Sequence, residues 1–178
     1  GGDADWRGVS AAIQEFVIES PVPVFVKEVG HGISASSAAI LVDLGVSWID
    51  VAGAGGTSWS QIEHIRGGRE GMSAFANWGV TTKEAIESIR DKGLPCMLVG
   101  SGGLRSGLDA AKVVRIGADI AAAAQPFLEP ARTSVQQTIK VIESWEKDFK
   151  ITMFSTGSKN LDELRTAKLL NERDRIEG

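Results

Sequence analysis

The sequence predicts an α/β fold with a parallel sheet, formed as half of a (β/α)8 barrel. One sequence pattern occurs three times: the end of a helix, a glycine, an apolar strand and a turn of small residues. Its three copies are DLGVSWIDVAG, DKGLPCMLVGSGG and RIGADIAAAAQ. Strands that alternate with helices form parallel sheets with right-handed crossovers. An open doubly wound sheet usually carries its phosphate-binding glycines after the first strand. Here glycine-rich tips follow successive strands, which favours the barrel.

A complete barrel has eight such units and ~250 residues, whereas we count four units and a helical tail in 178 residues. We therefore interpret residues 1–178 as a single partial domain, the C-terminal half of a barrel. Half a barrel has two open edges and an inward face that lacks the opposite strands. We expect such a chain to be weakly stable or to self-associate as a homo-oligomer.

The composition is that of an ordinary soluble domain, with 43% apolar residues, 24% charged residues and a formal charge of −4. It gives no basic surface for nucleic acid, and no apolar run approaches the ~20 residues of a membrane span. The single cysteine, Cys96, cannot form an internal disulfide, which fits a reducing compartment, and we interpret it as a core residue. No leader peptide begins at Gly1. We expect a cytoplasmic protein without nucleic-acid or membrane partners.

The first strand follows a loop, GGDADWRG, and a helix predicted over 9–18 from its apolar spacing. Pro21 ends that helix, and residues 24–27 form a short buried strand. A lysine and a glutamate, Lys27 and Glu28, stand where this strand leaves the sheet. We interpret them either as an ion pair or as site residues.

The second strand ends in the most informative stretch of the chain. After a helix that begins beyond Ser34 and ends at Gly45, the apolar strand 48–52 breaks into glycines in DVAGAGGTSW. Such a tip brings bare backbone N–H groups close to a phosphate or a flat cofactor, although tight turns use glycine as freely. About twenty residues then separate Trp59 from the next helix. They are either a lid over the strand tips or a surface loop.

The third unit begins with a capping box, because Thr81 and Glu84 have the required spacing. It continues with a helix over 82–92, a strand over 96–99 and the glycine turn GSGGLRSG. The remaining elements are a helix over 108–116, a strand over 119–123, a turn AAQPF, a helix over 131–145 and a tail that contains TGSKNLDEL.

Several of these segments together resemble one family. PVFVKEVGHGIS, IDVAGAGGTSW, NWGVTT, VGSGGLRSGLDAAKVVRIGAD, QPFLEPA and TGSKNLDEL resemble, in order and spacing, the type 2 isopentenyl diphosphate isomerases. The likeness extends over nearly all of the chain. It implies an FMN-dependent (β/α)8 barrel that interconverts isopentenyl and dimethylallyl diphosphate with Mg²⁺ and a flavin reduced by NADPH. By this resemblance the chain supplies strands 5 to 8.

The resemblance also implies which residues contact FMN. Lys27 matches the family lysine that faces the pyrimidine edge of the flavin, and at the position of Ala52 many relatives have serine, so one hydroxyl contact is absent. The glycine turn and the segment after the last strand match the phosphate cradle. The implied FMN contacts are Lys27, Ala52, Thr57, Gly102, Gly103, Leu104, Arg105, Ala124 and Gln125.

Elementary chemistry supports this phosphate cradle independently. A phosphate needs several convergent N–H donors, which a glycine turn and the following helix N-terminus provide. Gly103 is expected to let the backbone approach the phosphate oxygen closely. Arg105 can add a charged donor, or it is a solvated loop arginine.

Trp59 is placed to shape a prenyl pocket, or it anchors the core or the lid.

The resemblance places the acid/base and metal groups elsewhere. The glutamine implicated in proton transfer and the glutamate that binds Mg²⁺ precede GGDADWRG by four to five residues in the family, and the diphosphate-binding side chains lie further upstream. We therefore expect no catalytic residue and no metal ligand in this chain. His31 and His64 share no metal-ligand spacing, and we assign neither a catalytic role.

Two other functions stay open on the residues alone. Glycine-tipped flavin barrels also oxidise substrates, as in 2-hydroxy-acid oxidases and dihydroorotate dehydrogenases. The chain could instead be a non-catalytic half-barrel that binds phosphate or docks on partner chains.

Overall fold

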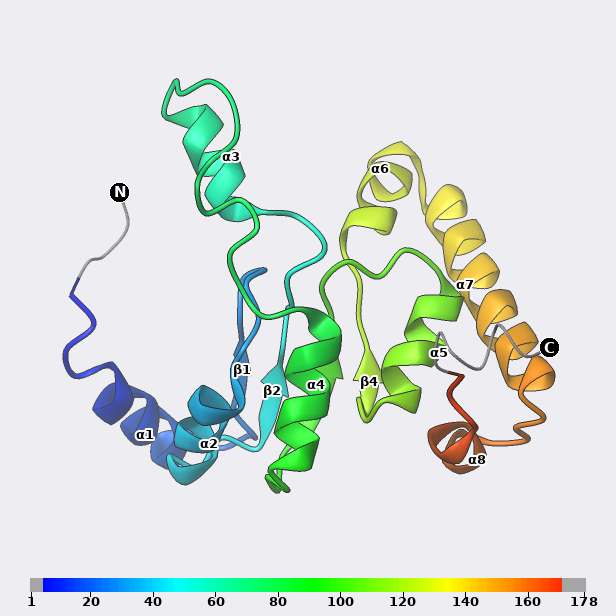
Figure 1. Ribbon diagram of the computed structural model, residues 1–178, viewed down its shortest axis with the longest axis horizontal. Coiled ribbons are helices and arrows are strands. Elements are labelled where there is room, and N and C mark those ends of the chain that lie inside the picture. Colours follow the sequence, from blue (N-terminus) through cyan, green and yellow to red (C-terminus); the bar gives the residue numbers. More distant parts are fainter. Residues whose placement is uncertain (1–4, 171–178) are drawn as a thin grey trace.

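The computed structural model describes residues 5–170, and the beginning of the predicted N-terminal loop, residues 1–4, lies outside the described residues. Its centre is one sheet of four parallel strands in the order β1-β2-β3-β4 (Figure 1). The strands are β1 (Phe25–Lys27), β2 (Trp48–Asp50), β3 (Met97–Gly100) and β4 (Ile120–Ala121). All four lie inside or within one residue of the predicted strands, and all three pairings are parallel. The prediction of four consecutive parallel strands is confirmed.

Helices connect the strands as the sequence predicts. The helix α1 (Val9–Glu19) precedes β1, and α2 (Ala35–Asp43), α4 (Thr82–Asp91) and α5 (Gly107–Arg115) follow β1, β2 and β3 in the chain. Ser34 caps α2 through a hydrogen bond from the N–H of Ser37. Thr81 and Glu84 form the predicted capping box at α4, in which each side chain accepts a backbone N–H of the other's residue.

The two faces of the sheet differ sharply in exposure. Ile49 and Leu98 point to one face and are fully buried in the main apolar cluster. Because side chains alternate along a strand, Phe25, Met97 and Ile120 point to the other face, where they are 47%, 40% and 46% exposed. Asp50 and Val99 lie on this second face as well and are 5% exposed, so the second face is open at these three positions and covered toward the carboxyl ends of β2 and β3.

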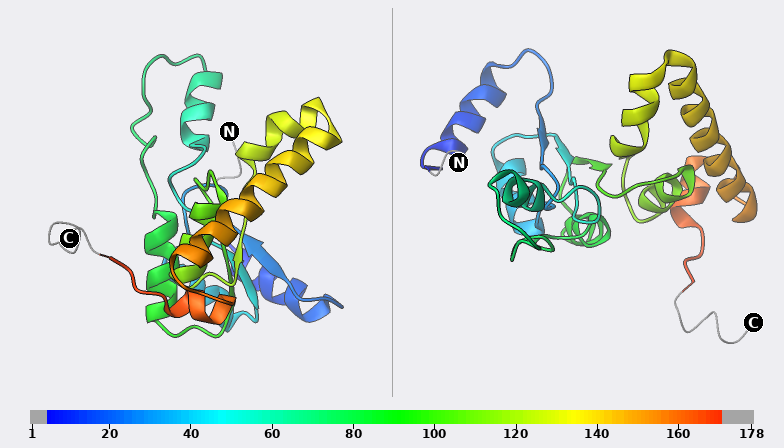
Figure 2. Two further views of the ribbon diagram at one scale, coloured as in Figure 1. Left: turned by 90° about the vertical axis from the view of Figure 1, so that its right-hand side faces the viewer. Right: turned by 90° about the horizontal axis from the view of Figure 1, so that it is seen from above.

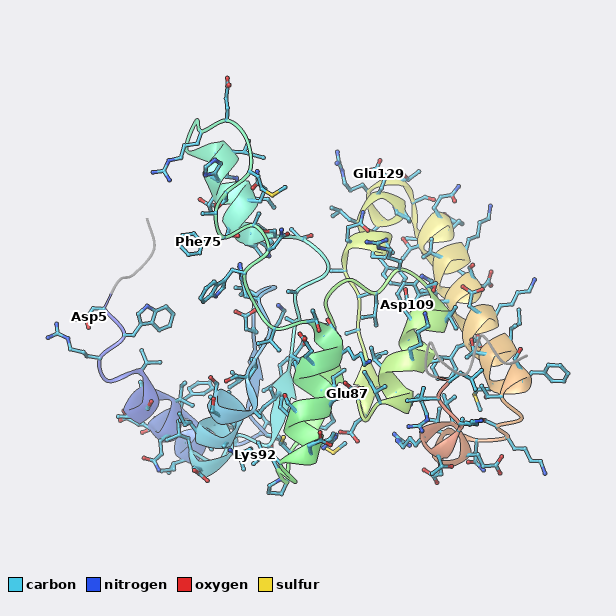
Figure 3. All side chains as sticks on the ribbon, in the orientation of Figure 1. Asp5, Phe75, Glu87, Lys92, Asp109 and Glu129 are labelled. Carbon is cyan, nitrogen blue, oxygen red and sulfur yellow. The ribbon has the colours of Figure 1, made fainter. Side chains whose placement is uncertain are left out.

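The segment after β2 contains a helix that the sequence did not predict. The helix α3 (Trp59–Arg66) begins at the N-cap Ser58 and projects from the carboxyl edge of the sheet (Figure 1). Gln61 ties it to the returning chain, since its side chain donates to the carbonyl of Gly71 at 3.0 Å and accepts from the N–H of Ser73 at 2.7 Å. Phe75 lies on that returning limb, clear of the strands (Figure 3). The segment is a hydrogen-bonded unit, and its closure as a lid stays a prediction.

The C-terminal helices also depart from the prediction. The predicted turn AAQPF and the single helix over 131–145 are wrong, because the chain forms α6 (Gln125–Thr133) and then α7 (Val135–Ser155). Pro126 lies in the first turn of α6, where its missing N–H removes no helical hydrogen bond. Ser134 is extended, with φ −171° and ψ 161°, so it ends α6 and caps α7.

The last two helices pack on α5. Helix α7 lies beside α5 (Figure 2), and α8 (Leu161–Thr166) also packs on α5. Leu164 of α8 is buried against Ala111 and Val114. The predicted helical tail therefore contributes a second, smaller apolar cluster.

A polar clamp holds the amino end of the sheet. The guanidinium of Arg90 on α4 donates to the carbonyl oxygens of Gly117 at 2.7 Å and Cys96 at 2.9 Å, and to Asp119 Oδ2 at 2.5 Å. The N–H of Leu98 donates to the same carboxylate oxygen at 2.8 Å. Cys96 is a buried core residue as interpreted, and burial raises the pKa of its thiol.

Candidate functional site

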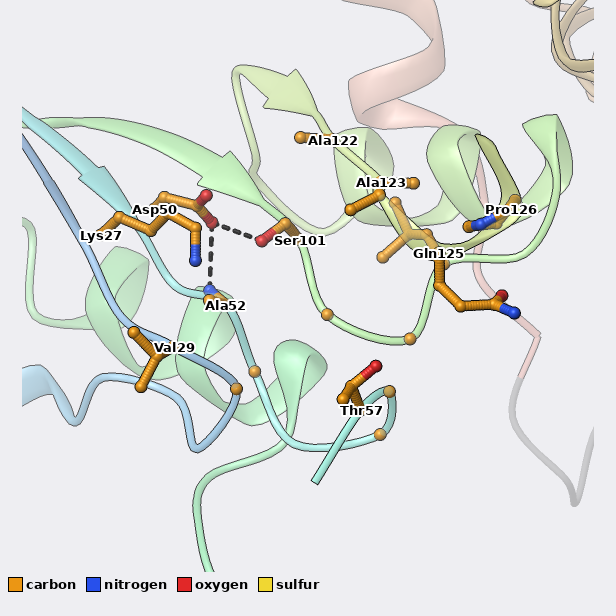
Figure 4. A pocket seen from close by; sticks show the side chains of 18 of the residues that line it. Lys27, Val29, Asp50, Ala52, Thr57, Ser101, Ala122, Ala123, Gln125 and Pro126 are labelled. Atoms are coloured by element: carbon orange, nitrogen blue, oxygen red, sulfur yellow. Dashed lines mark hydrogen bonds between the residues drawn. The ribbon is translucent and has the colours of Figure 1, made fainter. Parts of the chain in front are cut away.

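The carboxyl ends of all four strands border one open cleft of about 640 Å³ (Figure 4). The cleft is lined by residues from the segments that follow β1, β2, β3 and β4. The structure brings together there all ten residues assigned to the site from the sequence: Lys27, Ala52, Thr57, Trp59, Gly102, Gly103, Leu104, Arg105, Ala124 and Gln125. Their placement on one surface agrees with the expectation, and their roles as ligand contacts stay predictions.

The tip of β2 is strained and held from within. Ala52 has φ 34°, in the left-handed region that side chains other than glycine rarely adopt. Its N–H donates to Asp50 Oδ1 at 3.1 Å, and its carbonyl accepts the N–H of Gly32 at 3.1 Å. Strained backbone that neighbouring groups hold in place is typical of ligand-binding sites.

The glycine loops after β2 and β3 pack backbone against backbone. A Cβ on Gly102 would overlap the backbone of Gly53, and a Cβ on Gly103 would lie 2.6 Å from the carbonyl oxygen of Gly55. Gly102 and Gly103 also have φ 100° and 78°. The other glycine loop is therefore a close neighbour that excludes a side chain at 103, and the expected approach of a phosphate oxygen to Gly103 stays a prediction.

Backbone N–H groups without a hydrogen-bond partner border the cleft at one of these loops and at the start of α6. Among the described residues, no hydrogen bond occupies the N–H groups of Gly103, Leu104, Ala124 or Gln125. Ala124 is the N-cap of α6 and provides no side-chain cap, so the positive end of that helix opens into the cleft. Four free donors and a helix N-terminus make this rim suited to an anion such as a phosphate.

Arg105 can add a charge at the same rim. Its side chain is exposed, and no hydrogen bond or ion pair engages its guanidinium within residues 5–170. Only its backbone N–H is bonded, to Asp109 Oδ2 at 3.1 Å. The guanidinium is therefore available to a bound anion.

Lys27 and Glu28 do not form the ion pair that was one of their two interpretations. Lys27 Nζ donates to the backbone carbonyl of Glu28 at 2.6 Å. Glu28 Oε2 accepts the backbone N–H groups of Gly30, His31 and Gly32 at 2.6, 2.5 and 3.1 Å. Glu28 thus shapes the turn after β1, and Lys27 borders the cleft with its charge unpaired by Glu28.

Sequence reasoning missed two residues on the cleft floor, Asp50 and Ser101. Asp50 is 5% exposed, and its Oδ1 accepts the hydroxyl of Ser101 at 2.6 Å (Figure 4). Asp50 also pairs in register with Lys27 on the neighbouring strand. The available signal was a carboxylate inside the apolar run WIDVA, since a buried charge needs a partner.

The aromatic and histidine candidates lie at different places. Trp59 is 46% exposed at the start of α3 and borders the cleft, beside the turn at Gly30. His64 Nε2 pairs with the carbonyl of Glu70 at 3.2 Å on the projecting segment, away from the strand tips. Within residues 5–170, no three His, Cys, Asp or Glu side chains cluster closely enough to hold a metal ion.

A comparison with protein families identifies the family to which this chain belongs. Residues 4–171 match the sequence profile of the family described as FMN-dependent dehydrogenase. The chain is a member of the FMN-dependent dehydrogenase family. Its half-barrel with glycine-lined strand tips is the part of the family's fold that these residues form.

Two curated relatives of this family member carry the same name. The chain is 45% identical over 174 residues to the isopentenyl-diphosphate delta-isomerase of Stutzerimonas stutzeri, and 43% identical over 178 residues to that of Pseudescherichia vulneris. These matches cover 96% and 98% of the chain but 50% and 51% of the relatives. The chain therefore spans about half the length of the curated relatives it matches.

Solved structures confirm the fold of this family member. A lactate oxidase from Pediococcus acidilactici superposes with a TM-score of 0.70 at 22% identity, over 91% of the chain and 40% of the oxidase. A mandelate oxidase with bound benzoyl-formic acid gives 0.67 at 20% identity, over 89% of the chain and 42% of that protein. At such identities the likeness concerns the (β/α)8 fold alone.

Within the described part of the chain, none of the helices combines the length and apolarity that a membrane span requires.

Proposed function

We propose that this chain forms the FMN-binding half of the active site of a type 2 isopentenyl diphosphate isomerase, which interconverts isopentenyl and dimethylallyl diphosphate. The observation that carries the proposal is the rim of unpaired N–H donors at Gly103, Leu104, Ala124 and Gln125, above two interlocked glycine loops. Relatives at 41–45% identity that bear the isomerase name support the substrate assignment.

The free backbone donors and the two cations that line the cleft support the binding of a flavin mononucleotide. The free donors and Arg105 would hold the phosphate. Lys27 would face the pyrimidine edge of the ring, with Ala52 and Thr57 as further contacts, and Trp59 would border the prenyl pocket. When bound and reduced, FMN would supply an electron-rich ring to the reaction. The chain's own residues bind and orient it.

The described residues do not supply a complete acid/base pair. Isomerisation adds one proton to an alkene and removes another, which needs positioned acid and base groups. The charged residues that line the cleft are Lys27, Asp50 and Arg105. Lys27 and Arg105 are assigned to FMN, and Asp50 is bonded to Ser101. We propose that proton transfer comes from groups outside this half of the barrel.

The same holds for the other expected partners. The described residues do not fit a Mg²⁺ site, because they contain no suitable cluster of ligands. We propose that Mg²⁺ binds with groups of the complementary half, that NADPH reduces the flavin from solution, and that the protein acts in the cytoplasm as a homo-oligomer.

A reconstitution assay tests the proposal. The 178-residue chain is supplied with labelled isopentenyl diphosphate, FMN, Mg²⁺ and NADPH, alone and then with a separately expressed amino-terminal half of the Stutzerimonas stutzeri relative. We expect FMN to bind and turnover to appear only in the mixture. Turnover by the chain alone would contradict the half-site assignment.

The same assay separates the alternatives. Anaerobic bleaching of the bound flavin by a 2-hydroxy acid such as lactate or mandelate would identify an oxidase. Stable FMN binding without turnover in the mixture would indicate a non-catalytic half-barrel.

A further inference from the structure

The floor of the cleft contains a hydrogen bond that links the tips of β2 and β3. Asp50 is the last residue of β2, and Ser101 directly follows β3. Both are buried, at 5% and 9% exposure, and the Ser101 hydroxyl donates to Asp50 Oδ1 at 2.6 Å. The same carboxylate oxygen accepts the N–H of the strained Ala52. One oxygen atom therefore fixes two strand tips.

The backbone of Ser101 extends this link to the glycine loops. Its carbonyl oxygen accepts the N–H of Gly53 at 2.8 Å and the hydroxyl of Thr82 at 2.9 Å, and Thr82 Oγ1 also lies 2.7 Å from the carbonyl oxygen of Gly102. Gly53 begins one glycine loop and Gly102 begins the other. The spacing between the two loops is thus set at the point where each leaves its strand.

The loops transmit that spacing to the anion-binding rim. They touch backbone to backbone, so no flexible side chain lies between them to absorb a shift. The free N–H groups of Gly103 and Leu104 stand one and two residues beyond Gly102. A change at the Asp50–Ser101 bond therefore moves donors whose distance to a phosphate oxygen determines its affinity.

We propose that Asp50 and Ser101 form a positioning pair that sets the phosphate-binding geometry of the cleft, and so makes it selective for a phosphorylated flavin over the same flavin without phosphate. The inference rests on the proposed flavin site and adds to it two residues that act through the positions of the two glycine loops.

The amino end of the same strands offers a matched control. Asp119 is also a carboxylate that accepts a backbone N–H and a side-chain donor, but it lies at the opposite end of the sheet from the cleft. Its loss should lower stability without any effect on phosphate geometry.

The test measures dissociation constants for FMN and for riboflavin by flavin fluorescence in the 178-residue chain and in Ser101→Ala, Asp50→Asn and Asp119→Asn. Ser101→Ala should weaken FMN binding ~10-fold, the equivalent of one charge-assisted hydrogen bond, and riboflavin binding less than ~3-fold. Asp50→Asn keeps the acceptor oxygen and should preserve the FMN-to-riboflavin ratio. Asp119→Asn should lower the melting temperature and leave the ratio unchanged.

Should Ser101→Ala fail to fold, Ser101→Cys, a weaker donor of similar size, should show a smaller loss of FMN affinity in the same direction.

A ligand-free measurement separates this inference from the flavin site itself. Amide hydrogen exchange should accelerate at Ala52, Gly53 and Ala54, whose N–H groups are hydrogen-bonded, in the Ser101 variant and not at the amino end of β3. If the wild-type chain binds no flavin, the proposed function fails, whereas the exchange pattern still decides the pair. Unchanged exchange at Ala52, Gly53 and Ala54, or equal losses of FMN and riboflavin affinity, would overturn the positioning role.

Discussion

The two ends of the sheet use hydrogen bonds in opposite ways. At the amino end, the guanidinium of Arg90 and the carboxylate of Asp119 satisfy one another and three backbone groups. At the carboxyl end, glycine loops pack without side chains, and the N–H groups of Gly103 and Gln125 stay unpaired among the described residues. We therefore propose that the amino end stabilises the sheet and that the carboxyl end binds a ligand, so substitutions at the two ends should separate stability from binding.

The largest effect is expected for Gly103→Val. The new side chain would overlap the Gly55 backbone, and Gly103 itself has φ 78°, which valine rarely adopts. The free energy of unfolding should therefore fall by about 3 kcal/mol from strain and overpacking. The affinity for FMN should fall by more than ~100-fold. Gly93→Val is the control, because Gly93 has a similar φ of 67° and no atom within 4 Å of its Cβ position. Urea unfolding and flavin titration measure both. Equal FMN affinity in the Gly103 variant and the wild type would place the phosphate elsewhere.

Arg90→Met should produce the reverse pattern. Three hydrogen bonds of a partly buried guanidinium are lost, and Asp119 loses its charged partner. We expect the free energy of unfolding to drop by about 2 kcal/mol, while the FMN dissociation constant of the folded chain stays within ~2-fold. A large loss of FMN affinity at unchanged stability would remove the distinction between the two ends.

Lys27→Ala tests charge at the carboxyl end. At ~4 Å and an effective dielectric near 20, a cation attracts a negative charge on the flavin by roughly 4 kcal/mol before desolvation and solvent screening. Because Lys27 is exposed, solvent screening reduces this attraction. The variant should therefore lower the flavin reduction potential by about 30 mV, and weaken the reduced complex more than the oxidised one. Lys92→Ala, at the far end of α4, is the control. Equal weakening of both redox states would assign Lys27 a structural role.

The smallest effect is expected at the start of α4. Hydrogen bonds from the hydroxyl and N–H of Thr81 lower the pKa of the Glu84 carboxyl. The pKa of the Glu84 carboxyl is therefore lower in the folded state than its unfolded value of ~4.3. The resulting stabilisation is fully present at a pH above the unfolded pKa, and it is lost as the pH falls through the folded-state pKa. Glu84→Gln should flatten the decline of urea stability on the acid side of pH 4.5. Identical slopes in both chains would contradict this.

Local signals made most of the fold predictable. The capping box at Thr81 and the glycine ends of helices are encoded within four residues, and the apolar strands are bounded by them. Helix α3 was missed because its sequence, WSQIEHIR, has no clear apolar stripe and is held by Gln61 contacts ten and twelve residues away. The break at Ser134 was missed because nothing in the apolar periodicity changes there.

The site was predictable in its surface residues and not in its supports. Glycine tips and the family resemblance identified the residues that line the cleft. The bond between Asp50 and Ser101 joins positions 51 residues apart, and that between Arg90 and Asp119 joins positions 29 residues apart. Such pairs depend on which strands become neighbours, and a single sequence does not display that. The contact of Gly103 with Gly55 escaped for the same reason.

The order of the strands has a consequence for synthesis. Because β1, β2, β3 and β4 are neighbours in the order in which they occur in the chain, each strand leaving the ribosome pairs with the one made just before it. Among the four described strands, each pairing joins consecutive strands, so the loop-closure entropy of each of these pairings stays small. The cleft is completed in the same order, and α6, which presents the last free donors, is made only after the glycine loops that it faces.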